Sequence, residues 1–63
     1  MVMPMSLERF IKVYSNLPIN LRNEIILVVD DQPLTWNVAY MELKNNTTLG
    51  KTILQKLLEL EII

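Results

Sequence analysis

The sequence contains neither cysteine nor histidine. Without cysteine the chain can form no disulfide bond and no thiolate metal site. Without histidine it lacks the commonest metal ligand and the side chain best suited to proton transfer near neutral pH. No pairing of a nucleophile with a base is visible among the remaining residues. We therefore expect a protein that holds no metal and no cofactor and is not an enzyme.

Glycine and long apolar runs are also scarce. The only glycine is Gly50, so the glycine-rich loops that bind nucleotide phosphates are excluded. The longest unbroken apolar run covers residues 25–29, far short of the roughly 20 residues that cross a bilayer. The first residues carry no basic segment of the kind that opens a secretory signal. We expect no association with a membrane and a cytoplasmic location.

What the sequence does contain is a large hydrophobic share, 51% of 63 residues, with a net charge of −1. The length predicts a single small domain over residues 1–63, with a flexible tail over residues 1–5. A chain this short buries only about 60% of its unfolded surface and commonly needs a disulfide, a metal or a second subunit. Because the first two are excluded, we expect a homodimer.

Apolar residues recur at helical spacing near both ends of the chain. The first predicted helix covers residues 7–16, with Ser6 as its N-cap. The last predicted helix covers residues 49–61 and is capped by Thr47 or Thr48. Both helices carry their polar residues on the face opposite the apolar one, which is typical of a helix packed against a core.

The central part of the chain favours a strand followed by a helix. Residues 24–29 are rich in β-branched side chains and precede a turn-forming run, which predicts a short buried strand rather than a helix. Leu34 is expected to add a short partner strand, and Thr35 then caps a helix over residues 36–45. The predicted fold class is α+β, in the order helix, short strand or hairpin, helix, helix. The alternative is an all-α domain of four helices.

Three features of the sequence are candidates for binding or catalysis. Adjacent carboxylates at Asp30 and Asp31 are best explained as a turn, and less well as a weak site for a divalent cation. Trp36 and Tyr40 lie one helical turn apart, a spacing more typical of a core than of a platform that stacks on a planar ligand. Gly50 falls in the apolar arc of the last helix, where it predicts either close approach of another backbone, such as that of a second copy, or a capping turn.

The last predicted helix carries more apolar surface than one core contact needs. Its core-facing positions are predicted to be Leu49, Ile53, Leu57 and Leu60. Leu54 and Leu58 are then left uncovered, and Val38 and Met41 lie on the side of the preceding helix away from Trp36. Exposed apolar patches of this kind mark association sites. The candidate interface therefore consists of Val38, Met41, Leu54 and Leu58.

These features favour a non-catalytic, homodimeric protein-interaction or accessory protein that binds another, unidentified protein. A free edge on the strand at residues 25–29 would also pair with its copy in the dimer. The alternative function is a small dimeric regulator of helix-turn-helix type, with Lys51, Thr52 and Gln55 facing the major groove. The six basic residues are few and scattered. Because phosphate contacts supply most of the affinity for nucleic acid, it is the less favoured partner.

Overall fold

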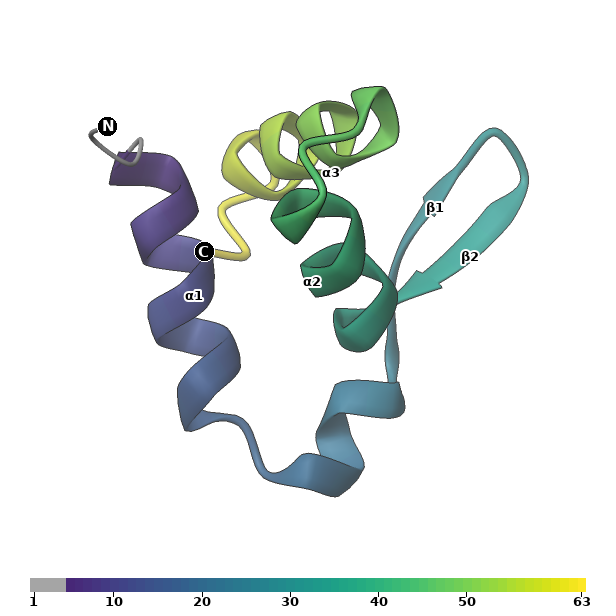
Figure 1. The fold of residues 1–63 in the computed structure, drawn as a ribbon. Helices are drawn as coiled ribbons and strands as arrows, with labels where there is room; N and C mark the ends of the chain where they lie inside the picture. The colour runs from purple at the N-terminus through teal and green to yellow at the C-terminus, as the bar shows by residue number, and fades with distance from the viewer. Residues whose placement is uncertain (1–4) are drawn as a thin grey trace.

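The structure is a computed structural model that describes residues 5–63. Within this range, three α-helices and a two-stranded antiparallel hairpin form one small α+β domain (Figure 1). The predicted α+β class and element order are confirmed, and the all-α alternative is wrong because residues 25–29 form a strand. The elements in chain order are α1 (Met5–Asn16), the 3₁₀ helix η1 (Ile19–Asn23), β1 (Ile25–Val29), β2 (Gln32–Thr35), α2 (Trp36–Lys44) and α3 (Thr48–Glu59).

Helix α1 begins earlier than the spacing of apolar residues predicts. It starts at Met5, so Ser6 lies inside its first turn and the predicted cap at Ser6 is wrong. Of the expected flexible tail, residues 1–4 lie outside the described residues. The helix ends at Asn16, two residues before Pro18, as expected because a proline pushes the residue before it out of the helical conformation.

The hairpin formed by β1 and β2 is closed by a two-residue turn. Asp30 and Asp31 both have positive φ, 50° and 66°, which is the signature of a type I′ turn. Aspartate tolerates this left-handed conformation better than most residues, which agrees with the predicted turn. Next to the turn Val29 pairs with Gln32, and a bulge interrupts the register between residues 25 and 27.

Threonine side chains cap both carboxyl-terminal helices, as predicted. The Thr35 hydroxyl accepts a hydrogen bond from the Val38 amide, 3.1 Å away, at the start of α2. The Thr47 hydroxyl accepts one from the Gly50 amide, 2.9 Å away, at the start of α3. Between the helices Asn46 has a φ of 53°, a left-handed conformation that ends α2 and turns the chain into α3. Helix α3 consequently lies across α2 (Figure 1).

The only glycine allows α2 and α3 to approach one another at backbone distance. A Cβ atom at Gly50 would lie 2.7 Å from the carbonyl oxygen of Glu42 and 3.1 Å from the amide nitrogen of Leu43. The expectation of a close backbone approach is thus correct, but the neighbouring backbone belongs to α2 of the same chain rather than to a second copy. The Gly50 amide also takes part in the capping turn, so both expected roles coincide.

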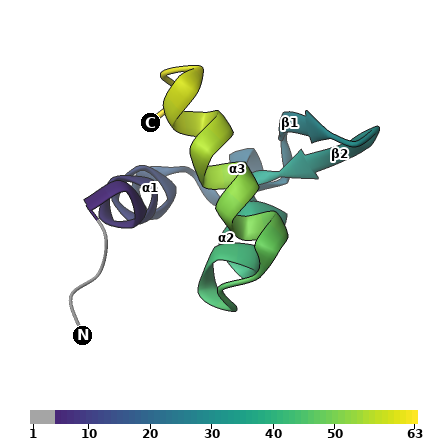
Figure 2. The same cartoon turned by 90° about the horizontal axis from the view of Figure 1, so that it is seen from above.

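The core lies where α1, the inner face of the hairpin and the crossing of α2 and α3 meet (Figure 2). Trp36 is 8% exposed, which confirms its assignment to the core. Leu60, expected to face the core, is instead 60% exposed, because α3 ends at Glu59 and Leu60 is its C-cap rather than part of its apolar face. The buried residues are Phe10, Leu27, Val29, Leu34, Trp36, Ala39, Ile53 and Leu57.

Candidate functional site

The outer face of the hairpin is apolar and uncovered. Leu27 and Val29 point into the core, whereas Ile25 and Val28 are each 60% exposed. Val28 pairs with the exposed Pro33, and partners across an antiparallel pair share one face of the sheet. The predicted strand forms at residues 25–29, but only one of its faces is buried. A two-stranded sheet packs only one of its faces here, so alternate side chains must face outward.

The two edges of the hairpin differ in what they offer to another strand. Residues that flank a two-residue turn exchange hydrogen bonds, so the next pair, Val28 and Pro33, points its backbone groups away from the partner strand. On β2, the outward position is occupied by Pro33, which has no N–H to donate. On β1, the outward position is occupied by Val28, which has both an N–H and a carbonyl oxygen. At this pair, β1 therefore offers both a donor and an acceptor and β2 offers only an acceptor, although the bulge between residues 25 and 27 interrupts the rest of the β1 edge.

The outer side of α2 carries the first half of the predicted interface. Val38 is 38% exposed and Met41 is 58% exposed, and they lie three residues apart on the same side of the helix. Trp36 and Ala39, on the opposite side, are buried. The pattern of this helix therefore correctly predicts which of its apolar side chains remain uncovered.

The second half of the predicted interface is less exposed than expected. Leu54 is half-buried and packs against the core, so it is not an uncovered residue of α3. Leu58 is also half-buried. The wide apolar arc of α3 is accommodated within the chain because both α1 and the hairpin flank this helix (Figure 2).

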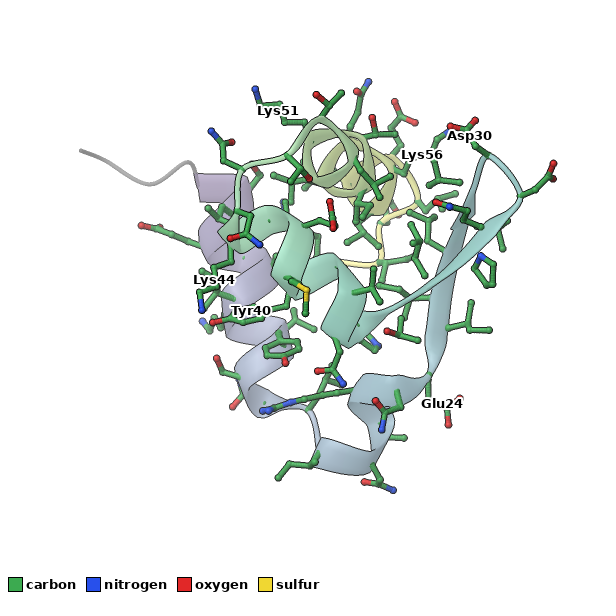
Figure 3. All side chains as sticks on the ribbon, turned by 45° about the vertical axis from the view of Figure 1, so that its right-hand side comes forward. Glu24, Asp30, Tyr40, Lys44, Lys51 and Lys56 are labelled. Carbon is green, nitrogen blue, oxygen red and sulfur yellow. The ribbon has the colours of Figure 1, made fainter. Side chains whose placement is uncertain are left out.

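The outward face of α3 is the surface that a helix-turn-helix regulator would present to DNA. Lys51 and Lys56 extend from it into solvent, on opposite sides of the helix (Figure 3). The Gln55 amide donates a hydrogen bond to the Glu59 carboxylate, 3.2 Å away, so one expected base-reading side chain is engaged by an acidic neighbour. Lys51 and Lys56 are thus separated, and with Glu59 they give α3 a surface of mixed charge rather than a basic one.

A stack of three side chains joins α1, η1 and α2. The rings of Tyr14 and Tyr40 are parallel within 3°, with centroids 4.5 Å apart. On Tyr14 the guanidinium of Arg22 lies 4.5 Å from the ring centroid. The Nε atom of Arg22 is buried and makes no hydrogen bond within the described residues. Burying an N–H group without a hydrogen bond is unfavourable, and the cation–π attraction between Arg22 and the Tyr14 ring offsets part of that free-energy cost.

A short hydrogen-bond chain extends this stack. The Tyr14 hydroxyl donates to the side-chain oxygen of Asn37 at 2.7 Å, and the Asn37 amide donates to the side-chain oxygen of Asn23 at 2.8 Å. Each of these polar groups satisfies another, and their placement fixes η1 against α1 and α2. The structural role of this cluster, which holds α1, η1 and α2 together, is therefore enough to explain it.

An apolar groove of about 230 Å³ lies beside the stack, between α1 and α2. The labelled side chains of Tyr40 and Lys44 mark its position in Figure 3. Its lining supplies van der Waals contacts and one cation, with no pair of groups suited to acid–base chemistry. The lining residues are Leu7, Phe10, Ile11, Tyr40, Leu43 and Lys44.

Within residues 5–63 no group of three acidic side chains is placed to hold a metal ion. Asp30 and Asp31 are exposed at the hairpin turn, where their backbone conformation explains their presence. The hydroxyls of Thr35 and Thr47 are used as caps.

No protein-family model, curated protein or solved structure matches this chain. Within the part of the chain that the structure describes, none of the helices has the length and apolar character needed to cross a membrane. The candidate functional site is therefore defined by geometry alone. It consists of two uncovered surfaces, one on the hairpin and one on α2.

The sequence pattern predicts a pairing edge on the strand at residues 25–29, but it does not predict the exposed outer face of the hairpin. Its exposed members, Ile25 and Val28, sit in an unbroken aliphatic run, which is equally typical of a strand buried on both faces. One signal was available. A run followed by a tight turn and a single short partner strand makes a two-stranded sheet, and the chain supplies too few elements to cover both of its faces.

Proposed function

We propose that this protein is a non-catalytic, homodimeric protein-interaction protein that acts as an accessory subunit for another protein. The single observation that carries the proposal is the exposure of large apolar side chains on two regular elements. They are Ile25 and Val28 on β1, each 60% exposed, and Met41 on α2, 58% exposed. Uncovered apolar surface on ordered elements is characteristic of association sites.

The two surfaces suit two different partners. The α2 surface, Val38 and Met41, is small and carries a methionine, whose flexible thioether adapts to varied apolar partners. We assign it to the other protein. The hairpin surface combines apolar side chains with unpaired backbone groups, which suits pairing with another strand. We assign it to the dimer.

The dimer is tested by sedimentation equilibrium over a wide range of protein concentration. We expect a mass that rises from 7.4 kDa toward twice that value, and a melting temperature that rises with concentration. A mass of 7.4 kDa at every concentration, with concentration-independent melting, would show that the homodimer does not form.

The α2 surface is tested by photo-crosslinking from position 41 in cells of the native host. A crosslinkable residue replacing Met41 should give one discrete adduct that excess unlabelled protein suppresses. The adduct should be lost when Val38→Asp is added. The control is the same probe replacing Lys56, an exposed residue on α3. Equal adducts from both positions would contradict a specific surface on α2.

A second candidate function, a helix-turn-helix regulator, is favoured by the tight joint between α2 and α3 at Gly50. Binding to duplex DNA that weakens steeply with salt, and that loses affinity in Lys51→Gln, would support this candidate. The mixed charge on the outward face of α3 favours the protein-interaction proposal instead.

A further inference from the structure

We infer that the apolar groove between α1 and α2 binds a medium-chain fatty acid, with the aliphatic tail in the groove and the carboxylate held by Lys44 and Tyr40. The groove encloses about 230 Å³. Three of its lining residues belong to α1 and three to α2, so the groove exists only where the two helices pack together. The inference depends on neither the proposed homodimer nor the proposed protein partner.

The interior of the groove is apolar and is closed at the bottom by the core. Phe10 lines the groove although it is fully buried, and its ring lies 5.8 Å from that of Trp36, centroid to centroid. The walls are formed by three half-buried aliphatic side chains, those of Leu7, Ile11 and Leu43. A hydrocarbon chain that enters the groove removes the exposed part of these walls from water, which is favourable.

The polar groups of the lining select an anion. Lys44 is the one charged residue that lines the groove, and no carboxylate lines it. Tyr40 and Lys44 lie four residues apart, so their side chains leave the same side of α2 (Figure 3). Within residues 5–63 no side chain bonds the Tyr40 hydroxyl or the Lys44 ammonium, and the Glu42 carboxylate is instead bonded by Thr47. Both free groups can donate hydrogen bonds, which suits the two oxygens of a carboxylate.

The volume of the groove limits the length of the ligand. An apolar cavity of roughly 150 Å³ is enough to bind benzene, and pockets for drug-sized ligands run from about 300 to 1,000 Å³. The groove lies between these values at about 230 Å³. At about 30 Å³ for each water-sized group, this volume holds about eight such groups. A straight chain of about eight carbons therefore fits, whereas a long-chain fatty acid would leave much of its tail in water.

The inference is tested by titrating the isotopically labelled full chain with octanoate and following its amide signals by NMR. We expect saturable shifts at Leu7, Ile11 and Leu43, with a dissociation constant of about 1 mM or lower. The amides of Ile25 and Val28, which are exposed and apolar but lie outside the groove, should not shift. Octanol and octylamine carry the same tail without the carboxylate, so each should bind about fivefold more weakly than octanoate.

Substitutions of the polar groups separate an anion site from a merely apolar groove. Lys44→Gln should weaken octanoate about fivefold and Tyr40→Phe about threefold, while both leave octanol binding unchanged. Lys44→Glu should reverse the preference, so that octylamine binds more tightly than octanoate. The matched control is Lys56→Gln, an exposed lysine on α3, which should bind octanoate as the wild type does. Because Tyr40 also stacks on Tyr14, Lys44→Gln decides the question if Tyr40→Phe does not fold, as judged by circular dichroism.

The outcomes divide as follows between support and contradiction. Saturable binding confined to the groove, with the expected order of ligands and variants, supports the inference. Shifts that spread to Ile25 and Val28 without saturating would mean only non-specific adsorption of the tail, and would overturn it. Equal affinity for octanol and octanoate, or an equal loss in Lys56→Gln, would show that Lys44 holds no anion and would also overturn it. The same holds if octanoate causes no shift at all.

Discussion

The joint between α2 and α3 and the attachment of α1 hold helices together in different ways. At the first, the backbones themselves touch, because Gly50 has no side chain to separate α3 from the Glu42 carbonyl. At the second, side chains fill the space: Phe10 is fully buried and Tyr14 stacks on Tyr40. A contact between backbones leaves no room for an added atom, whereas a contact through side chains fails when atoms are removed.

The hydrogen bonds follow the same division. Between α2 and α3, the Thr47 hydroxyl accepts a hydrogen bond from the Gly50 amide and donates one to the Glu42 carboxylate, 2.6 Å away. Polar groups that are close in sequence therefore stabilise this turn. Helix α1 is tied to distant parts of the chain, through Tyr14 to Asn37 and through Arg9 to the main-chain oxygen of Ile63. The joint depends on neighbours in sequence, and α1 depends on the completed fold.

The largest expected effect is the loss of α1 when its buried ring is removed. Phe10→Ala should lower the free energy of unfolding by about 3–5 kcal/mol, the range for truncating a buried phenylalanine. Urea titration measures the change, and amide hydrogen exchange locates it. We expect protection to fall most in α1. Phe10→Leu should cost clearly less, and an equal loss of protection in α2 and α3 would contradict the division between the two regions.

The second largest effect is expected at Gly50, where adding an atom, rather than removing atoms as at Phe10, should destabilise the protein. In most helices glycine to alanine stabilises, by roughly 0.5–1 kcal/mol. Gly50→Ala should instead destabilise by about 1–3 kcal/mol, because the new Cβ meets backbone that cannot rotate away. Lys51→Ala, one residue on and exposed, is the matched control and should change stability by less than about 0.5 kcal/mol. A stabilised Gly50→Ala would show that the two backbones are not in contact.

A smaller effect is expected from the cap that opens α3. Thr47→Ala removes the acceptor for the Gly50 amide and the donor to Glu42, and should cost about 1–2 kcal/mol. Thr47→Ser keeps the hydroxyl and should recover most of the loss. Thermal unfolding followed by circular dichroism is sufficient to rank the two. Equal stability of the two variants would mean that the hydroxyl contributes nothing to the joint.

The smallest expected effect concerns the hydrogen bond that connects α1 to α2. Tyr14→Phe keeps the stacked ring but removes the hydroxyl that bonds Asn37, and should cost about 0.5–1.5 kcal/mol. Tyr40→Phe keeps the same stack from the other side, and within the described residues the Tyr40 hydroxyl makes no side-chain hydrogen bond. Chemical denaturation should therefore show a larger loss for Tyr14→Phe. The reverse order would contradict a stabilising role for the hydrogen bond between Tyr14 and Asn37.

Local signals in the sequence were reliable where the physics is local. Thr35 and Thr47 cap their helices because a threonine hydroxyl reaches the amide three residues ahead wherever a helix begins. The turn at Asp30 and Asp31 likewise depends only on adjacent residues. Ser6 shows the limit of this reasoning: it has the right side chain, but the helix starts one residue before it.

The candidate site was predictable only in part. Helical spacing correctly separates Val38 and Met41 from the buried face of α2, because residues on opposite sides of one helix cannot share a neighbour. It does not predict the half-buried state of Leu54, since spacing is silent about whether one element or two will flank a helix. It also does not identify the exposed hairpin face, because an aliphatic strand looks the same with one face covered as with both.

By itself, the sequence determined the elements of this protein: three helices, a hairpin and two threonine caps. Its single glycine also indicated that another backbone approaches closely at Gly50. It did so because dihedral preference, capping and periodicity act over a few residues. Only the tertiary structure decided what meets Gly50, which side of β1 is covered, and where Leu60 lies relative to the core. Those depend on contacts between elements far apart in the chain, and only the assembled fold brings such elements together.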